Sequence, residues 1–370
     1  MRLSSALKKH IILIFLLLVI NLFISTPYKC NGLDSFSENS IGSSCTIFTV
    51  ALGETVFFGN NEDYKSNNAY QWYIPSQNIT TRDGVKEIYG GVFFGFDNNG
   101  DEGVDTWPQG GMNEYGLCFD ANGLPNVALH LDPSLSFPYS DYALSQVLWE
   151  CRNVEEVIDW YQNHRWFSLG AQIHYADKSG DAVVVGVNTT TGKWAFTRKN
   201  STYLVSTNFN LDNPESGHYP CSRYATATQM LSEITNENDL TISACASILH
   251  EVRQEGTYAT KYSNIFDPVN LDIYFNYGRE FAKHEKINLL GKLAGEESFE
   301  EKEVFFGITG TEGYVSVNTV KINILSRTTN VNTAYIAIPI VIGVLCIPIS
   351  VFIIKSVREI MSLRRGEKGE

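Results

Sequence analysis

The 370-residue sequence lacks the patterns that mark several common enzyme classes. It contains no C-x-x-C pair, no G-x-S-x-G turn and no glycine-rich phosphate loop, and His250-Glu251 is not followed by a second histidine four residues on. The run at 97–101 resembles a calcium loop but lacks the glycine and the distal glutamate that such a loop needs. The sequence therefore predicts no metal and no organic cofactor.

Positive charge is also scarce. Lysine and arginine number 28 against 41 aspartates and glutamates, which gives a net charge of -13. Residues 1–44 and 331–370 each carry +2, so subtracting these two ends leaves -17 for residues 45–330. So acidic a body repels phosphate backbones, and nucleic-acid binding is excluded as a function.

Two long apolar runs lie at the ends of the chain. Residues 11–24 follow Lys8 and Lys9, as in a secretory signal, although an uncleaved anchor would have the same pattern. Residues 334–354 form 21 residues without a charge, followed by a basic tail. This length spans a bilayer, and the basic flank indicates the cytoplasmic side. We expect a single-pass protein of the cell membrane whose body is extracellular.

Cysteines and glycosylation triplets agree with that location. Residues 45–330 contain five cysteines, an odd number that leaves at least one thiol unpaired. The other four allow three disulfide pairings or none. Acceptor triplets for N-glycosylation begin at Asn78, Asn188 and Asn200. The sequence leaves open whether the protein forms a homo-oligomer.

Strand-like and helical segments follow one another in separate blocks. β-Branched runs and turn residues predict strands at 45–50, 55–58, 91–95, 116–120, 171–175, 182–187, 194–197, 203–207, 271–276, 303–308 and 313–317. Apolar spacing predicts helices at 140–148, 154–161, 221–231 and 242–252. Block order of this kind is typical of an α+β protein with layered sheets and helices packed on them. No linker or repeat divides residues 45–330, which we expect to form one domain.

Cys45 is the candidate nucleophile. It begins the first predicted strand of the body, and the run Gly59-Asn-Asn-Glu-Asp63 ends the strand that returns from it. Antiparallel strands lie about 5 Å apart, so a hairpin would bring Asp63 beside Cys45. If the chain is cut before Cys45, the new α-amine has a pKa near 8 and can take the proton of its own thiol. A nearby carboxylate would orient that amine.

These runs resemble a known family. Ser44-Cys-Thr-Ile-Phe, Val56-Phe-Phe-Gly-Asn-Asn-Glu-Asp63 and Gln109-Gly-Gly-Met-Asn-Glu-Tyr-Gly-Leu117 are similar to the choloylglycine hydrolase and penicillin V acylase group of N-terminal nucleophile hydrolases. The resemblance covers most of residues 45–225. It implies a four-layer α/β/β/α sandwich and an enzyme that cuts linear amide C–N bonds.

The resemblance also implies roles for individual residues. Cys45 would be the N-terminal nucleophile and Asp63 would orient its amine. Asn122, expected just after a strand, and Asn208 would lie near the oxyanion, and Arg223 would steady the site. The family often has arginine at the position of Asn60, so a bile-salt substrate is not favoured. The aromatic cluster Tyr70, Trp72 and Tyr73 is read as ordinary packing rather than as an acyl pocket.

The predicted organisation is therefore a leader and propeptide at 1–44, a hydrolase domain at 45–330, a transmembrane helix at 331–355 and a cytoplasmic tail at 356–370. The expected substrate is a small N-acyl amide, with autocatalytic or secondary cleavage before Cys45. Two alternatives stay open. One is a cysteine dipeptidase of a related branch, whose pattern is close to Gly-Asn-Asn-Glu-Asp. The other is a surface binding protein that kept the fold without the activity.

Overall fold

The computed structural model describes residues 45–65, 68–81, 83–96, 108–140, 143–216, 219–278, 281, 284–295, 301–305 and 314–323. Every described residue belongs to one compact unit of the chain. The predicted leader, the apolar segment 334–354, the cytoplasmic tail and the run 97–101 lie outside the described residues. Among the helices that the structure does describe, none combines the length and the apolar character needed to cross a bilayer.

The first of two large sheets is six-stranded, and the predicted nucleophile immediately precedes one of its strands, β1 (Thr46–Leu52). The strand order of this sheet is β12 (Tyr203–Ser206), β1, β2 (Thr55–Asp63), β13 (Thr260–Asp267), β14 (Asp272–Tyr277) and β15 (Glu285–Asn288). Every neighbouring pair is antiparallel. The predicted hairpin is therefore present as β1 and β2, with a turn at Gly53, whose φ of 60° suits glycine.

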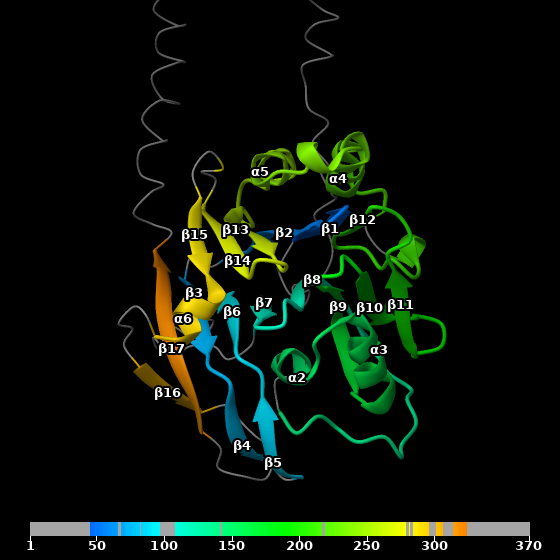
Figure 1. Ribbon diagram of the computed structural model, residues 1–370. Helices are drawn as coiled ribbons and strands as arrows, with labels where there is room; N and C mark the ends of the chain where they lie inside the picture. The colour runs from blue at the N-terminus through cyan, green and yellow to red at the C-terminus, as the bar shows by residue number, and fades with distance from the viewer. Residues whose placement is uncertain are drawn as a thin grey trace, which may run out of the picture. The chain divides into compact units, whose positions relative to one another are not determined.

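The second sheet has nine strands. Its order is β11 (Trp194–Arg198), β10 (Ala182–Val187), β9 (Ser168–Ala176), β8 (Cys118–Ala128), β7 (Gly110–Asn113), β6 (Gly91–Phe96), β3 (Asn68–Ile74), β17 (Tyr314–Asn323) and β16 (Glu301–Phe305). A separate hairpin consists of β4 (Gln77–Thr81) and β5 (Gly84–Ile88). Figure 1 shows the two large sheets facing each other.

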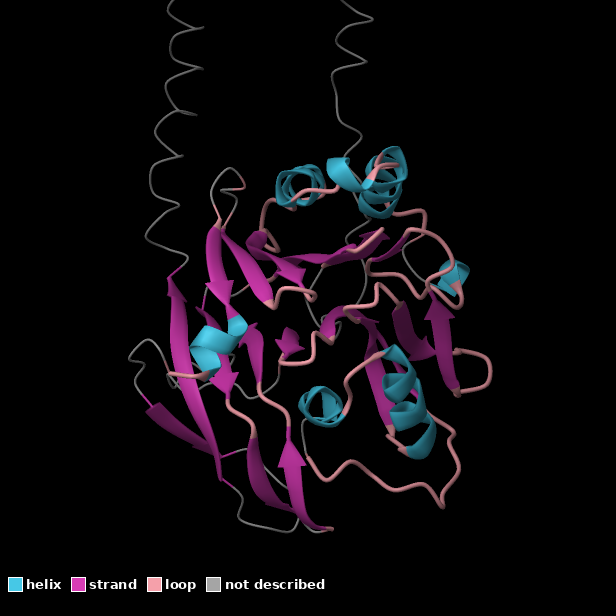
Figure 2. Cartoon of the chain, viewed as in Figure 1, coloured by secondary structure: helices cyan, strands magenta, loops and turns pink. Residues whose placement is uncertain are grey.

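Helices cover the outer faces of both sheets. α4 (Ser222–Glu233) and α5 (Ile242–Glu251) pack on the six-stranded sheet, whereas α2 (Ala143–Glu150) and α3 (Val154–Asn163) pack on the nine-stranded sheet. A short α6 (Leu289–Leu293) follows β15, and two 3₁₀ turns lie at Pro214–Ser216 and Glu237–Asp239. Figure 2 shows the helices as layers outside the strands. The described chain thus has the helix, sheet, sheet, helix layering that the family resemblance implied.

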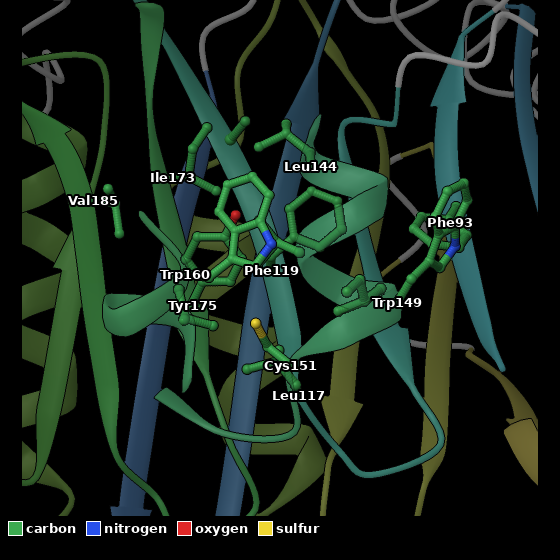
Figure 3. Packing of buried hydrophobic residues seen from close by; sticks show 14 of the residues in the cluster. Phe93, Leu117, Phe119, Leu144, Trp149, Cys151, Trp160, Ile173, Tyr175 and Val185 are labelled. Carbon is green, nitrogen blue, oxygen red and sulfur yellow. The ribbon is translucent and has the colours of Figure 1, made fainter. Parts of the chain in front are cut away.

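Three apolar cores hold the four layers together. The core between the sheets contains Phe58, Phe94 and Phe266, and the core under α4 and α5 contains Phe48 and Leu249. The core under α2 and α3 is drawn in Figure 3, where Phe93, Phe119, Trp149, Trp160, Tyr175 and others meet. Burial of such side chains contributes roughly 2 kcal/mol each. Tyr70, Trp72 and Tyr73 are buried in these cores, in agreement with the packing interpretation.

Two strands are longer than the sequence indicated. β2 was expected to stop near Phe58 but continues through the run Gly59–Asp63, because β13 pairs along its other edge. β8 was expected to stop at Asp120 but continues to Ala128 and places Asn122 inside the strand, opposite Gln172 of β9. The glycine and proline at 123 and 125 suggest a turn locally, yet the ladder accommodates them as an irregularity between Gly123 and Val127. Strands β3, β4, β5, β7, β13 and β15 were not predicted.

All five cysteines of the body are free thiols in the structure, so none of the three possible pairings is present among them. Cys45, Cys118, Cys151 and Cys245 are buried, and Cys221 is half-buried. A thiol that packs inside a core behaves as a small apolar side chain. What separates Cys45 from the others is therefore its neighbours rather than its burial.

Candidate active site

The register of the β1–β2 hairpin determines which side chains surround Cys45. Thr46 lies opposite Asn61, so Cys45 is next to Glu62 at the open end of the hairpin. Side chains alternate along β2: Asn60 donates to Asp120 in the other sheet, whereas Asn61 donates to the Leu249 carbonyl of α5 at 2.7 Å. Asn60 and Glu62 therefore face the space between the sheets, and Asp63 faces the helices.

The Cys45 side chain and backbone are both engaged. Its Sγ donates a hydrogen bond to Glu62 Oε1 at 3.4 Å, and the side chain is fully buried. Its backbone carbonyl accepts two hydrogen bonds, from Asn122 Nδ2 at 3.2 Å and from Arg223 Nη1 at 2.8 Å. Two donors from different layers thus fix the position of this residue.

Asp63 lies on the helix side of the same strand. Its carboxylate accepts hydrogen bonds from Thr260 Oγ1 and from Gln254 Nε2, the latter at 3.2 Å. Arg223 Nη1 lies 3.7 Å from Asp63 Oδ2. Burial raises the pKa of Asp63 to about 7, and the Arg223 charge and the two hydrogen bonds oppose that rise.

Arg223 joins the predicted residues into one network. It lies in the first turn of α4 and also donates from Nη1 to Thr46 Oγ1 at 2.8 Å and from Nη2 to Asn208 Oδ1 at 3.0 Å. Asn208 Nδ2 in turn donates to the Gly123 carbonyl at 3.0 Å. The structure therefore brings all five predicted site residues together, from the position just before β1, from β2, β8 and α4, and from the segment after β12. In this intact chain the amide donors of both asparagines are bound to backbone carbonyls.

Several polar residues at this site were not predicted. Glu62 and Asn60 belong to the run Gly59–Asp63, but only Asp63 was assigned a role from it. Asp120 lies two residues before Asn122, on the same face of β8, and receives a hydrogen bond from Asn60. Thr260 and Gln254 follow α5 in sequence, and nothing in their local pattern points to a site 191 or more residues away.

Burial controls the acidity of the groups around the thiol. Burial, and then the charges of Glu62, Asp120 and Asp63, hold the pKa of Cys45 well above its usual range, while a hydrogen bond from the Asp63 backbone opposes them. Burial raises the pKa of Glu62 to about 8, and burial with the Glu62 charge raises that of Asp120. In the intact chain the thiol is protonated at neutral pH, so a nucleophilic role requires a base beside it.

The raised pKa of Glu62 predicts how stability depends on pH. Unfolded, the carboxyl loses its proton near its ordinary value of 4.5, whereas the folded protein retains it up to about 8. Folded protein thus binds more protons in this window, and stability falls as pH rises through it. We expect Glu62→Gln to gain stability relative to wild type by roughly 2–4 kcal/mol between pH 5 and pH 8.

Urea unfolding of both proteins at the two pH values measures this difference. Glu87→Gln, at an exposed position of β5, is the matched control and should show no such change. A Glu62→Gln effect that is the same at both pH values would contradict the assignment of a buried, protonated Glu62.

The described residues contain no metal-binding group, and the cavity found in the structure lies apart from this site. Among the described residues, no group of three or more histidine, cysteine, aspartate and glutamate side chains is arranged to hold a metal ion. A cavity of about 370 Å³ lies on the outer side of α5, lined by Ser243, Ala246, Ser247, His250, Glu251, Phe281 and His284. None of the residues that converge on Cys45 lines that cavity, so the chemistry of the site does not extend to it.

Comparisons with known proteins give the family and the fold of the chain. A family model described as acyl-coenzyme A:6-aminopenicillanic acid acyl-transferase matches residues 50–267. The match begins five residues after Cys45 and includes Asp63, Asn122, Asn208 and Arg223. No curated protein sequence matches the chain.

Solved structures of two kinds share the fold. A mutant of the conjugated bile acid hydrolase from Clostridium perfringens has a TM-score of 0.53 and 17% identity, over 75% of this chain and 97% of its own. Another variant of that enzyme gives a TM-score of 0.54 at 17% identity, over 78% and 100%. Penicillin V acylase from Agrobacterium tumefaciens gives 0.53 at 15% identity, over 69% and 89%. At these identities the likeness shows the fold, and function has to be argued from the site.

Proposed function

Because the chain belongs to the acyl-coenzyme A:6-aminopenicillanic acid acyl-transferase family, we propose that it is a hydrolase of linear amide C–N bonds with Cys45 as its nucleophile. The structural neighbours named above are a bile acid hydrolase and a penicillin acylase, which supports a general amide hydrolase function. The proposed substrate is a small N-acyl amide or short peptide. The proposed setting is the extracellular face of a membrane, with the apolar C-terminal segment as anchor and glycans on the body.

One observation carries this proposal: the Cys45 carbonyl is clamped by Asn122 and Arg223 while Arg223 also faces Asp63. A cysteine that only filled a core would not need its backbone held by two polar side chains from β8 and α4. Clamping fixes both the thiol and the backbone nitrogen of the same residue. Such fixed geometry is what a residue that supplies nucleophile and base requires.

The reaction follows from the atoms that this residue would present. Cleavage of the bond between Ser44 and Cys45 leaves a free α-amine, which takes the proton of the thiol. The thiolate then attacks the amide carbonyl carbon, and the collapsing intermediate releases the amine product with that proton. Water hydrolyses the resulting thioester and restores the thiol. Preplaced amide donors stabilise the charge on the carbonyl oxygen by about 3 kcal/mol each, the role proposed for Asn122 and Asn208.

Maturation provides the direct test of this function. We expect mass spectrometry of active protein to show a chain that begins at Cys45, and we expect this material to release amines from a panel of N-acyl amides and dipeptides. The uncut chain, separated from the same preparation, is the matched control and should be inactive, because it has no free amine on Cys45. Activity in material that begins before residue 45 would contradict the mechanism, and absence of activity in the cut chain would favour a binding protein.

A further inference from the structure

A second group of polar side chains lies between the sheets, directly beside the thiol. We call it the inter-sheet polar cluster, and it consists of Asn60, Glu62, Asp120, Tyr262 and Asn264. On β13, Tyr262 lies opposite Glu62 and Asn264 lies opposite Asn60, so their side chains share the face that Asn60 and Glu62 turn to the other sheet. All five side chains are at most 1% exposed. Such a polar group is unusual in the middle of an apolar layer.

Hydrogen bonding within the cluster is incomplete. Asn60 Nδ2 donates to Asp120 Oδ2 and, at 3.4 Å, to Glu62 Oε2. The Tyr262 hydroxyl and both side-chain polar atoms of Asn264 have no partner. Native proteins leave few buried polar atoms unpaired, because each costs about 1–3 kcal/mol. Unpaired atoms gathered next to a nucleophile indicate that a polar ligand belongs there.

The two carboxyl groups of the cluster indicate the chemical class of that ligand. Glu62 and Asp120 are two buried carboxyl groups on one side of the sheet, and neither takes part in any ion pair within the described chain. Arg223 faces Asp63 on the opposite side of β2. Without such a partner Glu62 keeps its proton up to about pH 8, and its carboxylate form becomes stable in this place only when a cation compensates the charge. A group with one positive charge and several N–H donors would satisfy Glu62 together with the open acceptor on Asn264.

The position of Glu62 indicates that the cation belongs to the substrate. Its Oε1 atom is 3.4 Å from the Cys45 sulfur, and in the thioester formed on that sulfur an α-amino group would be three bonds away. Deepening the function proposed above, on which it rests, we propose that the inter-sheet polar cluster binds a primary ammonium group on the acyl part of the substrate. The substrate class is then an aminoacyl amide with a free amino group, rather than an acyl chain that is neutral or anionic.

The α-ammonium of Cys45 itself is the rival occupant, and mechanism argues against it. A base has to be unprotonated before it can act, and negative charge on Glu62 or Asp120 would raise the pKa of that amine. A substrate ammonium has the opposite effect. The charges of Glu62 and Asp120 raise the pKa of the Cys45 thiol, so a cation that offsets them makes the thiol easier to ionise. The substrate ammonium that the inter-sheet polar cluster binds would therefore also activate the Cys45 thiol.

Two anilides that differ only in the amino group test the proposal. Alanyl p-nitroanilide carries the ammonium group, and propionyl p-nitroanilide lacks it. We expect mature wild-type protein to show a kcat/KM ratio of roughly 10–100 in favour of the alanyl compound, the range for a hydrogen bond to a charged group. In Glu62→Gln this ratio should fall to about its value for uncatalysed hydrolysis. Comparing ratios between variants cancels the intrinsic reactivity of the two anilides.

Matched variants separate recognition from general damage. Glu87→Gln makes the same chemical change at an exposed position and should keep the wild-type ratio. Tyr262→Phe removes only the hydroxyl oxygen from the cluster, so the surrounding side chains need not repack. It should also lower the ratio of the two kcat/KM values, and it keeps the proposal testable if Glu62→Gln fails to fold. A wild-type ratio no higher than that of uncatalysed hydrolysis, with both anilides cut, would overturn the ammonium site but leave the amidase function standing. If the mature chain cuts neither anilide nor any amide of the panel, the amidase function fails and this inference with it.

Discussion

Cys45→Ala is expected to lower amide hydrolysis by a factor on the order of 10⁴ or more. The substitution removes the proposed nucleophile, while Asn122 and Arg223 can still hold the backbone of residue 45, because both bind its carbonyl oxygen. Cys45→Ser retains a weaker nucleophile in the same place, so we expect partial activity from it. Amine release from the best substrate of the panel measures all three proteins.

Cys245→Ala is the matched control. Cys245 is also a fully buried free thiol, but it lies in the apolar core under α5, away from the carboxyl groups. Its replacement should cost a little stability and leave the catalytic rate within about twofold, as for other small core changes. If Cys45→Ala kept a tenth of the wild-type rate of amide hydrolysis, Cys45 would not be the nucleophile and the proposed mechanism would be wrong.

Arg223→Ala should produce the second largest effect, on activity and stability together. The guanidinium group donates to the Cys45 carbonyl, Thr46 and Asn208, and it faces a fully buried Asp63. Without it Asp63 loses its charged neighbour, and its pKa rises beyond the present value of about 7. We expect a loss of roughly 3–5 kcal/mol in unfolding free energy, typical of a broken buried pair, and a fall in kcat/KM of about 10²–10³.

Arg223→Lys separates the contribution of the positive charge at position 223 from that of the guanidinium geometry. Lysine keeps the positive charge near Asp63 but cannot reproduce a planar fork that reaches several acceptors at once, so it should recover stability better than activity. Urea unfolding and kcat/KM are measured side by side. Arg198→Ala, which breaks ion pairs with Glu155 and Asp181 at the surface, should cost no more than about 1 kcal/mol. Equal behaviour of the Arg223 and Arg198 variants would show that the network has no special role.

Short-range sequence patterns were sufficient to predict many of the helices and strands. The β1–β2 hairpin, the four main helices and most strands of the β8–β12 region follow from apolar periodicity and turn residues, which act within a few positions of the chain. Strands β3 and β13 were missed because each pairs with a strand far away in sequence, β17 and β2 respectively. Strand β7 pairs with its chain neighbours β6 and β8, but its run Gly110–Asn113 has the residues of a turn. Asn122 was expected just after a strand, whereas pairing with β9 continues the strand through it.

At the site, the family resemblance indicated the groups that a hydrolase would need, but not how they are oriented. The run Gly59–Asp63 contains two carboxyl groups in succession, and a strand sends neighbours to opposite faces. Only the pairing of β2 with β1 and β13 shows that Glu62 turns to the thiol and Asp63 to Arg223. The role of Glu62 was therefore missed although its position in the motif was known.

The sequence by itself determined the family resemblance, the acidic body, the hairpin that begins at Cys45 and the set of side chains able to act on an amide, because all of these depend on residue type and short spacing. Tertiary structure decided which of those side chains meet. Asp120 and Tyr262 reach Glu62 from strands 58 and 200 residues away, across a sheet interface and a strand pair. Burial there raises the pKa values of the thiol and carboxyl groups, and no local pattern in the chain encodes that loss of water.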